Sequence, residues 1–151
     1  MITESDLGGA ASTAAEGVLL MSRASTDTRY RHEFAPTVEA VPAARYAVRA
    51  ICSMHGVDSD GPELAVSELV TNALRHARIA DYVGVLVEVT DRALDLDVSD
   101  PAPALAPQLD RPAPADDAVQ GRGLLIVAAV SDHVNVFVSD DRKHVRARFN
   151  R

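Results

Sequence analysis

The sequence predicts an α+β fold, a two-layer α/β sandwich in which helices cover one face of a sheet. Three observations predict it. Apolar residues recur every three or four positions in residues 37–78, which indicates helices. They then recur at every second position in residues 82–100, and again from residue 133 to the end, which indicates strands. Because neighbouring strands are joined by short turns, we expect a mixed, mostly antiparallel sheet.

The first half of the chain contains one predicted strand and two predicted helices. Residues 28–36, TRYRHEFAP, are rich in β-forming types and end at a proline, so they predict a strand. Residues 37–57 predict a helix with Pro42 in its first turn and Gly56 as its stop. Residues 62–78, which open at a proline, predict the second helix.

The second half contains two predicted hairpins with a helix between them. Residues 82–90 and 93–100 alternate around a turn at Asp91 and Arg92. Residues 124–130 are apolar all the way round, which predicts a buried helix. The closing hairpin is expected to pair residues 133–139 with 144–150 through a turn at 140–143.

Residues 101–120 predict a long loop, because they hold five of the eight prolines. A chain of 151 residues suits one domain, which we assign to residues 27–151. We expect residues 1–26, small and polar in composition, to form a disordered tail.

Composition excludes several function classes. The net charge is -7 and no basic patch appears, so direct nucleic-acid binding is not expected. No segment has the roughly 20 apolar residues of a membrane span, and the N-terminus has no basic signal region. The single cysteine, Cys52, rules out an internal disulfide and fits a core position in a cytoplasmic protein.

The second predicted helix carries an acid and an amide away from its apolar stripe. Glu68 and Asn72 are four residues apart, so their side chains lie one above the other on the same side of the helix. Arg75 and His76 fall on the same side. Surface helices are normally polar outside, so a solvated face is the more common explanation of these residues when the helix is taken alone.

The entrance to the last predicted helix resembles an anion site. Gly121 and Gly123 let the backbone approach a ligand, and the first N–H groups of a helix attract negative charge. Arg122 between them adds positive charge. The alternative is a pair of glycines that shapes a tight turn, and the dinucleotide-binding pattern is absent.

Asp100 ends the second alternating segment, just before the proline-rich loop. A carboxylate at a strand end can accept a hydrogen bond from the exocyclic amine of a ligand. The alternative is an aspartate that only initiates a turn before a proline.

Taken in order, these segments resemble the GHKL ATPase/kinase superfamily, whose fold is the Bergerat fold. ELVTNALRHA resembles its N box, DLDVSDPAP stands where its G1 box belongs, and QGRGLLIVAAVSD resembles its G2 box. The resemblance covers about residues 28–150. The short chain points to the branch of anti-sigma-factor serine kinases and similar stand-alone ATP-binding proteins.

The resemblance implies roles for the matching residues. Asn72 corresponds to the amide that holds Mg²⁺, Glu68 to the general base, and Asp100 to the residue that reads adenine. Residues 101–120 correspond to the lid over the nucleotide. The segment that faces the phosphates corresponds to Gly121, Arg122, Gly123 and Leu124.

The function implied is that of a Mg-ATP-dependent protein serine/threonine kinase that is also an anti-sigma factor. Its substrate would be an anti-sigma-factor antagonist of the STAS type, its alternating partner a sigma factor, and its assembly a homodimer. The usual G1 pattern, Asp-x-Gly-x-Gly, is replaced here by Asp100-Pro-Ala-Pro-Ala. This departure favours an alternative, an ATP-binding module that sequesters its partner without phosphotransfer. An autonomous ATPase and an acidic interaction domain without nucleotide are the remaining alternatives.

Overall fold

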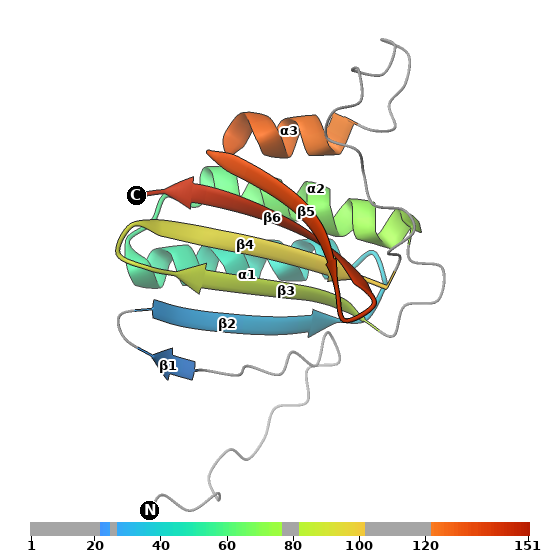
Figure 1. The fold of residues 1–151 in the computed structure, drawn as a ribbon, viewed down its shortest axis with the longest axis horizontal. Helices are drawn as coiled ribbons and strands as arrows, with labels where there is room; N and C mark the ends of the chain where they lie inside the picture. The colour runs from blue at the N-terminus through green and yellow to red at the C-terminus, as the bar shows by residue number, and fades with distance from the viewer. Residues whose placement is uncertain (1–21, 25–26, 77–81, 102–121) are drawn as a thin grey trace, which may run out of the picture.

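The computed structural model describes residues 22–24, 27–76, 82–101 and 122–151. Within them, the chain forms six strands and three helices (Figure 1). In chain order, these elements are β1 Ser22–Ala24, β2 Asp27–Phe34, α1 Ala40–His55, α2 Asp60–His76, β3 Val83–Val89, β4 Ala93–Asp100, α3 Arg122–Val130, β5 His133–Ser139 and β6 Arg142–Asn150.

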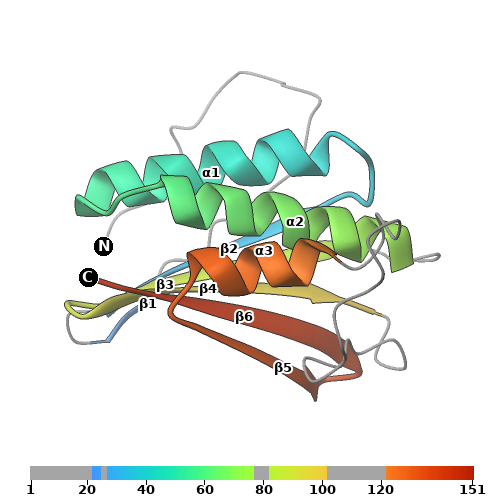
Figure 2. The same cartoon turned by 90° about the horizontal axis from the view of Figure 1, so that it is seen from above.

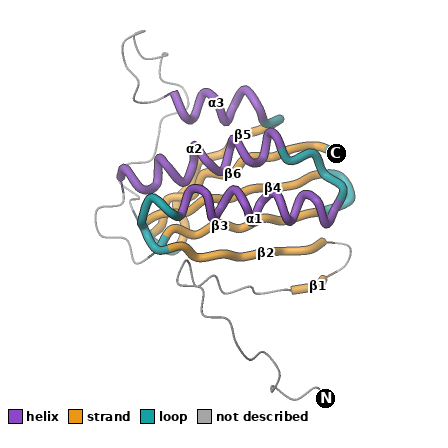
Figure 3. Tube along the Cα trace, turned by 180° about the vertical axis from the view of Figure 1, so that it is seen from behind, coloured by secondary structure: helices purple, strands orange, loops and turns teal. Residues whose placement is uncertain are grey.

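The strands form one sheet in the order β1-β2-β3-β4-β6-β5. All three helices lie on the same face of this sheet, and the other face is left without a helix (Figures 2 and 3). The predicted two-layer α+β sandwich is therefore confirmed. Every pairing among the described strands is antiparallel, so the sheet is more uniform there than the mixed one we expected.

The core lies between the helices and the inner face of the sheet. The four valines of β3 that share one face are all buried, as are Leu94, Leu96 and Val98 of β4. Cys52 of α1 is a buried free thiol in this core, as expected, and burial raises its pKa to about 11. The alternation in the sequence thus identifies the inner face correctly.

The helix ends follow local chemistry. Gly56 adopts the left-handed conformation with φ 64° at the end of α1, as predicted, and its N–H bonds back to the last turn. Helix α2 begins at Asp60, two residues earlier than predicted, so Pro62 lies within the first turn. Asp60 and Glu63 place negative charge in this turn, which favours the helix start.

The last hairpin corrects the expected turn. Only Asp140 and Asp141 form it, both with positive φ (52° and 56°), and β6 begins at Arg142. Two successive left-handed residues make the tight turn that matches strand twist, and aspartate tolerates this conformation. Lys143, which we placed in the turn, therefore lies in a strand.

Helix α3 corrects a second prediction. We expected an apolar helix to be buried, but among its residues only Val127 is, and Leu125 is 49% exposed. The helix lies at the edge of the helical layer, beside α2 and near β5 (Figure 1). The apolar pattern of this segment could not show that one side of the helix has no neighbouring element among the described residues.

Two further predictions fall partly outside the described residues. Strand β1 lies within residues 1–26, the expected tail, and pairs with β2. The rest of that segment, apart from residues 22–24, is not described, and neither are residues 102–121, which include nearly all of the expected loop.

Candidate functional site

The predicted site residues come from elements that meet at one end of the molecule. The last turns of α2, the end of β4, the start of β6 and the start of α3 all lie at this end (Figures 1 and 2). Glu68 and Asn72 come from α2, Asp100 from β4 and Gly123 from α3. We call these four residues together the candidate site.

Glu68 lies directly against Gly123. A Cβ added to Gly123 would lie 2.9 Å from Oε2 of Glu68 and 3.7 Å from its Cβ. The absence of a side chain at residue 123 therefore lets the carboxylate approach the backbone of the first α3 turn. Two of the predicted site residues, distant in sequence, are brought into contact.

Asn72 lies one helical turn beyond Glu68 and, like it, is half-buried. The solvated-face alternative fits Arg75 of the same helix, which is exposed, better than it fits these two residues. The described residues contain no cluster of three or more carboxylate, imidazole or thiol groups that could hold a metal ion. Mg²⁺ usually takes only one or two protein ligands and the rest from phosphates and water, so a single amide oxygen fits it.

Asp100 is held by a residue that the sequence did not lead us to expect. It is 2% exposed, and its Oδ2 lies 3.0 Å from Nζ of Lys143, which is 1% exposed. The two residues are direct partners across β4 and β6. Although the charges are paired, Nζ makes no hydrogen bond of good geometry within the described residues.

One signal in the sequence points to Lys143. Residues 145, 147 and 149 are apolar and alternate with polar residues, which identifies the inner face of β6. Lys143 lies two positions before Val145 and therefore belongs to the same alternating series. With the turn confined to two residues, the same parity places a lysine on the inner face.

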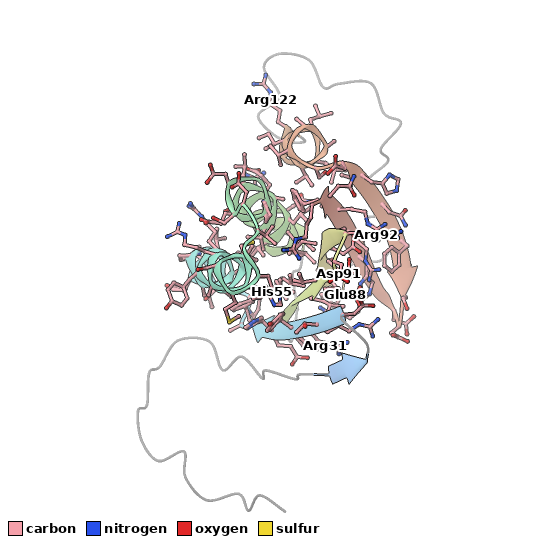
Figure 4. All side chains as sticks on the ribbon, turned by 90° about the vertical axis from the view of Figure 1, so that its left-hand side faces the viewer. Arg31, His55, Glu88, Asp91, Arg92 and Arg122 are labelled. Carbon is pink, nitrogen blue, oxygen red and sulfur yellow. The ribbon has the colours of Figure 1, made fainter. Side chains whose placement is uncertain are left out.

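The remaining predicted residues are less closely gathered. Gly121 lies outside the described residues. Arg122 is exposed and points away from α2 and the sheet (Figure 4). Leu124 is half-buried and packs against the core, which is a structural role.

Beside Glu68, a shallow hollow of about 680 Å³ opens between α1 and α2. Arg45 and Arg49 of α1 and Ser67 of α2 line it, together with Glu63. Glu63 accepts two hydrogen bonds from Arg49, of 2.8 and 2.6 Å, and one of 2.7 Å from Ser59. The bonds from Arg49, more than any other cause, lower the pKa of Glu63 to about 2. Glu68 thus lies between this hollow and the start of α3.

A model of the histidine kinase-like ATPase domain family matches residues 34–149. The chain belongs to this family. Membership implies that it binds a nucleotide. The matched region contains the described elements from α1 to β5 and all of β6 except Asn150. The predicted membership of the GHKL superfamily is therefore confirmed.

A solved structure shares the fold. It is the crystal structure of the RsbU and RsbW domains of Rv1364c from Mycobacterium tuberculosis, with a TM-score of 0.61 and 17% identity. The match covers 82% of this chain and 33% of that one, so the chain spans about a third of its length. The search of curated proteins found no match. None of the helices in the described residues has the length and apolar character needed to cross a membrane.

Proposed function

We propose that the chain is a Mg-ATP-dependent protein serine/threonine kinase and anti-sigma factor of the RsbW-like kind, acting in a partner-switching circuit. The observation that carries the proposal is the contact of Glu68 with Gly123 at the start of α3. It places an acid beside the helix end where backbone N–H groups attract phosphate. Family membership supplies the nucleotide, and the solved neighbour contains a domain named RsbW.

In this proposal, Glu68 is the general base. The serine hydroxyl of the substrate gives its proton to Glu68 as its oxygen bonds the γ-phosphorus, and the bond to the bridging oxygen breaks with its electrons on ADP. Asn72 would hold Mg²⁺, which would supply charge neutralisation on the phosphates. Phosphoryl transfer requires mainly positioning and electrostatic stabilisation, which these few groups provide.

The hollow between α1 and α2 gives a protein substrate access to Glu68. Glu68 is one of the residues that line this hollow, and its carboxylate lies against Gly123. A serine presented from the hollow would therefore reach Glu68 without passing through the core. The substrate proposed is an anti-sigma-factor antagonist of the STAS type, the alternating partner is a sigma factor, and the assembly is a homodimer.

Radiolabel transfer from ATP to a candidate antagonist tests the general base. Loss of a positioned base typically costs at least about a hundredfold in rate, so we expect Glu68→Gln to reduce transfer that far while ATP binding persists. Glu39→Gln, the same chemical change at an exposed position before α1, is the matched control. If Glu68→Gln transfers phosphate as fast as the control, the assignment of Glu68 is wrong.

A second candidate function is sequestration of a partner without phosphotransfer. It is favoured by Pro101, which follows Asp100 and removes a backbone donor there. Under this alternative, no label reaches any antagonist, yet ATP still changes the affinity for a sigma factor. Transfer and pulldown measured on the same preparation separate the two functions.

A further inference from the structure

Strand β5 is the last strand of the described sheet, and it lacks the features that normally keep an edge from pairing (Figure 1). Natural edge strands are commonly short, or they carry charged residues, proline or a bulge. The opposite edge follows this rule, because β1 has three residues and includes Arg23. Strand β5 has seven residues, HVNVFVS, with no lysine, arginine, aspartate, glutamate or proline. Its register with β6 runs without interruption from His133 to Ser139, so it presents a long and regular edge.

The side chains of β5 suit contact with an apolar strand. Its three valines share the inner face of the sheet, where Val134 and Val136 are half-buried against the core. The third, Val138, is 53% exposed. Helix α3, which contacts β5, leaves Leu125 49% exposed. The apolar layer between the helices and the sheet therefore reaches the surface at this edge.

The sequence of β5 is complementary to itself in an antiparallel arrangement. When Val136 lies opposite the partner's Val136, Val134 and Val138 lie opposite one another across the two copies, and so do Asn135 and Phe137. This register pairs all seven residues and keeps the valines of both copies on one face. Each copy carries a net charge of -7, so two copies repel over much of their surface. A strand without formal charges is where they can approach most easily.

We propose that β5 is a dimer interface, at which it pairs antiparallel with β5 of a second copy of the chain about a twofold axis at Val136. The two sheets then join into one continuous sheet. Because both copies use the same edge, the assembly closes after two chains, and the outer edges of the joined sheet are the short β1 strands. This inference rests on the homodimer of the proposed function and deepens it by naming the surface.

Sedimentation of the whole chain over a range of concentrations tests the interface. We expect wild type to form dimers as its concentration rises. Val138→Lys places an ammonium group opposite the partner's Val134, twice in the symmetric dimer, so we expect the dissociation constant of the dimer to rise at least about tenfold. Val38→Lys, the same change at a 77% exposed position before α1, is the matched control and leaves this constant unchanged.

Engineered cysteines test the register. Val136→Cys places two thiols directly opposite each other across the axis, close enough for a disulfide. Ser139→Cys, on the same strand, is the matched control, because its two copies lie six residues apart along the pairing, or about 20 Å. The native thiol of Cys52 is buried and does not compete. Under mild oxidation by a copper–phenanthroline complex, we expect a covalent dimer of Val136→Cys and none of Ser139→Cys on non-reducing electrophoresis.

The outcomes separate the inference from the proposed kinase. A monomeric wild type overturns the inference together with the proposed homodimer, and so does a partner strand supplied only by another protein. A dimer that Val138→Lys weakens no more than Val38→Lys does, or that crosslinks equally well through Ser139→Cys, also overturns it. If Val138→Lys does not fold, the two cysteine variants decide. A wild type that dimerises through β5 but transfers no label ends the kinase proposal and leaves the inference standing.

Discussion

Strands β4 and β6 carry acid–base pairs on both faces of the sheet, and the pairs on the two faces differ in burial and in hydrogen bonding. On the outer face, Arg148 donates hydrogen bonds of 2.8 and 2.7 Å to Asp95, and Asp97 bonds to Arg146 and His144. The arginines there remain 36% and 53% exposed. On the inner face, Asp100 and Lys143 are paired and both are at most 2% exposed.

This difference teaches how to distinguish a structural pair from a functional one. The outer pairs keep one partner in solvent and satisfy the buried acid with well-formed hydrogen bonds, which suits a face that has no helix over it. The inner pair buries both charges and leaves a donor unsatisfied within the described residues. A pair of the second kind adds little stability for its cost, so we expect its role to be in ligand binding.

The largest expected effect comes from breaking the inner pair. Asp100→Asn leaves the buried ammonium of Lys143 without a counter-charge, so we expect the free energy of unfolding to fall by about 3–5 kcal/mol. Asp95→Asn, the matched change on the outer face, should cost about 1 kcal/mol, because Arg148 is half-exposed. Urea denaturation of both variants measures the difference. Equal losses would show that the faces do not differ.

Replacing the whole inner pair sharpens the comparison. Buried ion pairs can often be exchanged for apolar side chains of similar size without loss. We therefore expect Asp100→Leu with Lys143→Met to recover at least about 2 kcal/mol relative to Asp100→Asn, while nucleotide binding is lost. The same denaturation assay and a nucleotide titration measure the two effects. If the double variant is stable and still binds nucleotide, Asp100 has no role in nucleotide binding.

The Glu63 cluster gives an intermediate effect that depends on pH. Its folded pKa of about 2 lies below the ordinary value of 4.5, so its contribution is complete above pH 4.5 and is lost as the pH falls from 4.5 to 2. Because Arg49 is largely exposed, we expect this contribution to be about 1–2 kcal/mol. Denaturation of wild type and Glu63→Gln at pH 7 and pH 3 measures it. A difference between the two proteins that is as large at pH 3 as at pH 7 contradicts the assignment.

The smallest expected effect is that of salt on the stability cost of these substitutions. It should again differ between the outer and the inner face of the sheet. Raising the ionic strength from about 0.05 to 1 M shortens the screening length to about 3 Å, which weakens exposed pairs most. We expect the cost of Asp95→Asn to shrink by about half and that of Asp100→Asn to stay within experimental error. If the cost of Asp100→Asn falls with salt as well, solvent reaches the inner pair.

Patterns within one element could be predicted from the sequence, and long-range neighbours could not. The alternation of Val83 to Val89 fixed the inner face of β3, and the four-residue spacing of Glu68 and Asn72 placed both on one side of α2. Lys143 was misplaced because two left-handed aspartates shorten the turn. The exposure of α3 depends on which elements surround it, and periodicity carries no information about that.

The central claim is that a magnesium–nucleotide complex binds at the candidate site, where α2, α3 and the end of β4 meet. Amide chemical-shift mapping of the whole chain with Mg-ATP tests it most directly. The account predicts that the largest shifts fall on Asn72, Asp100, Gly123 and their neighbours, while Asp95 and Arg148 on the outer face stay unchanged. Shifts confined to the outer face, or no saturable shifts at all, would contradict it.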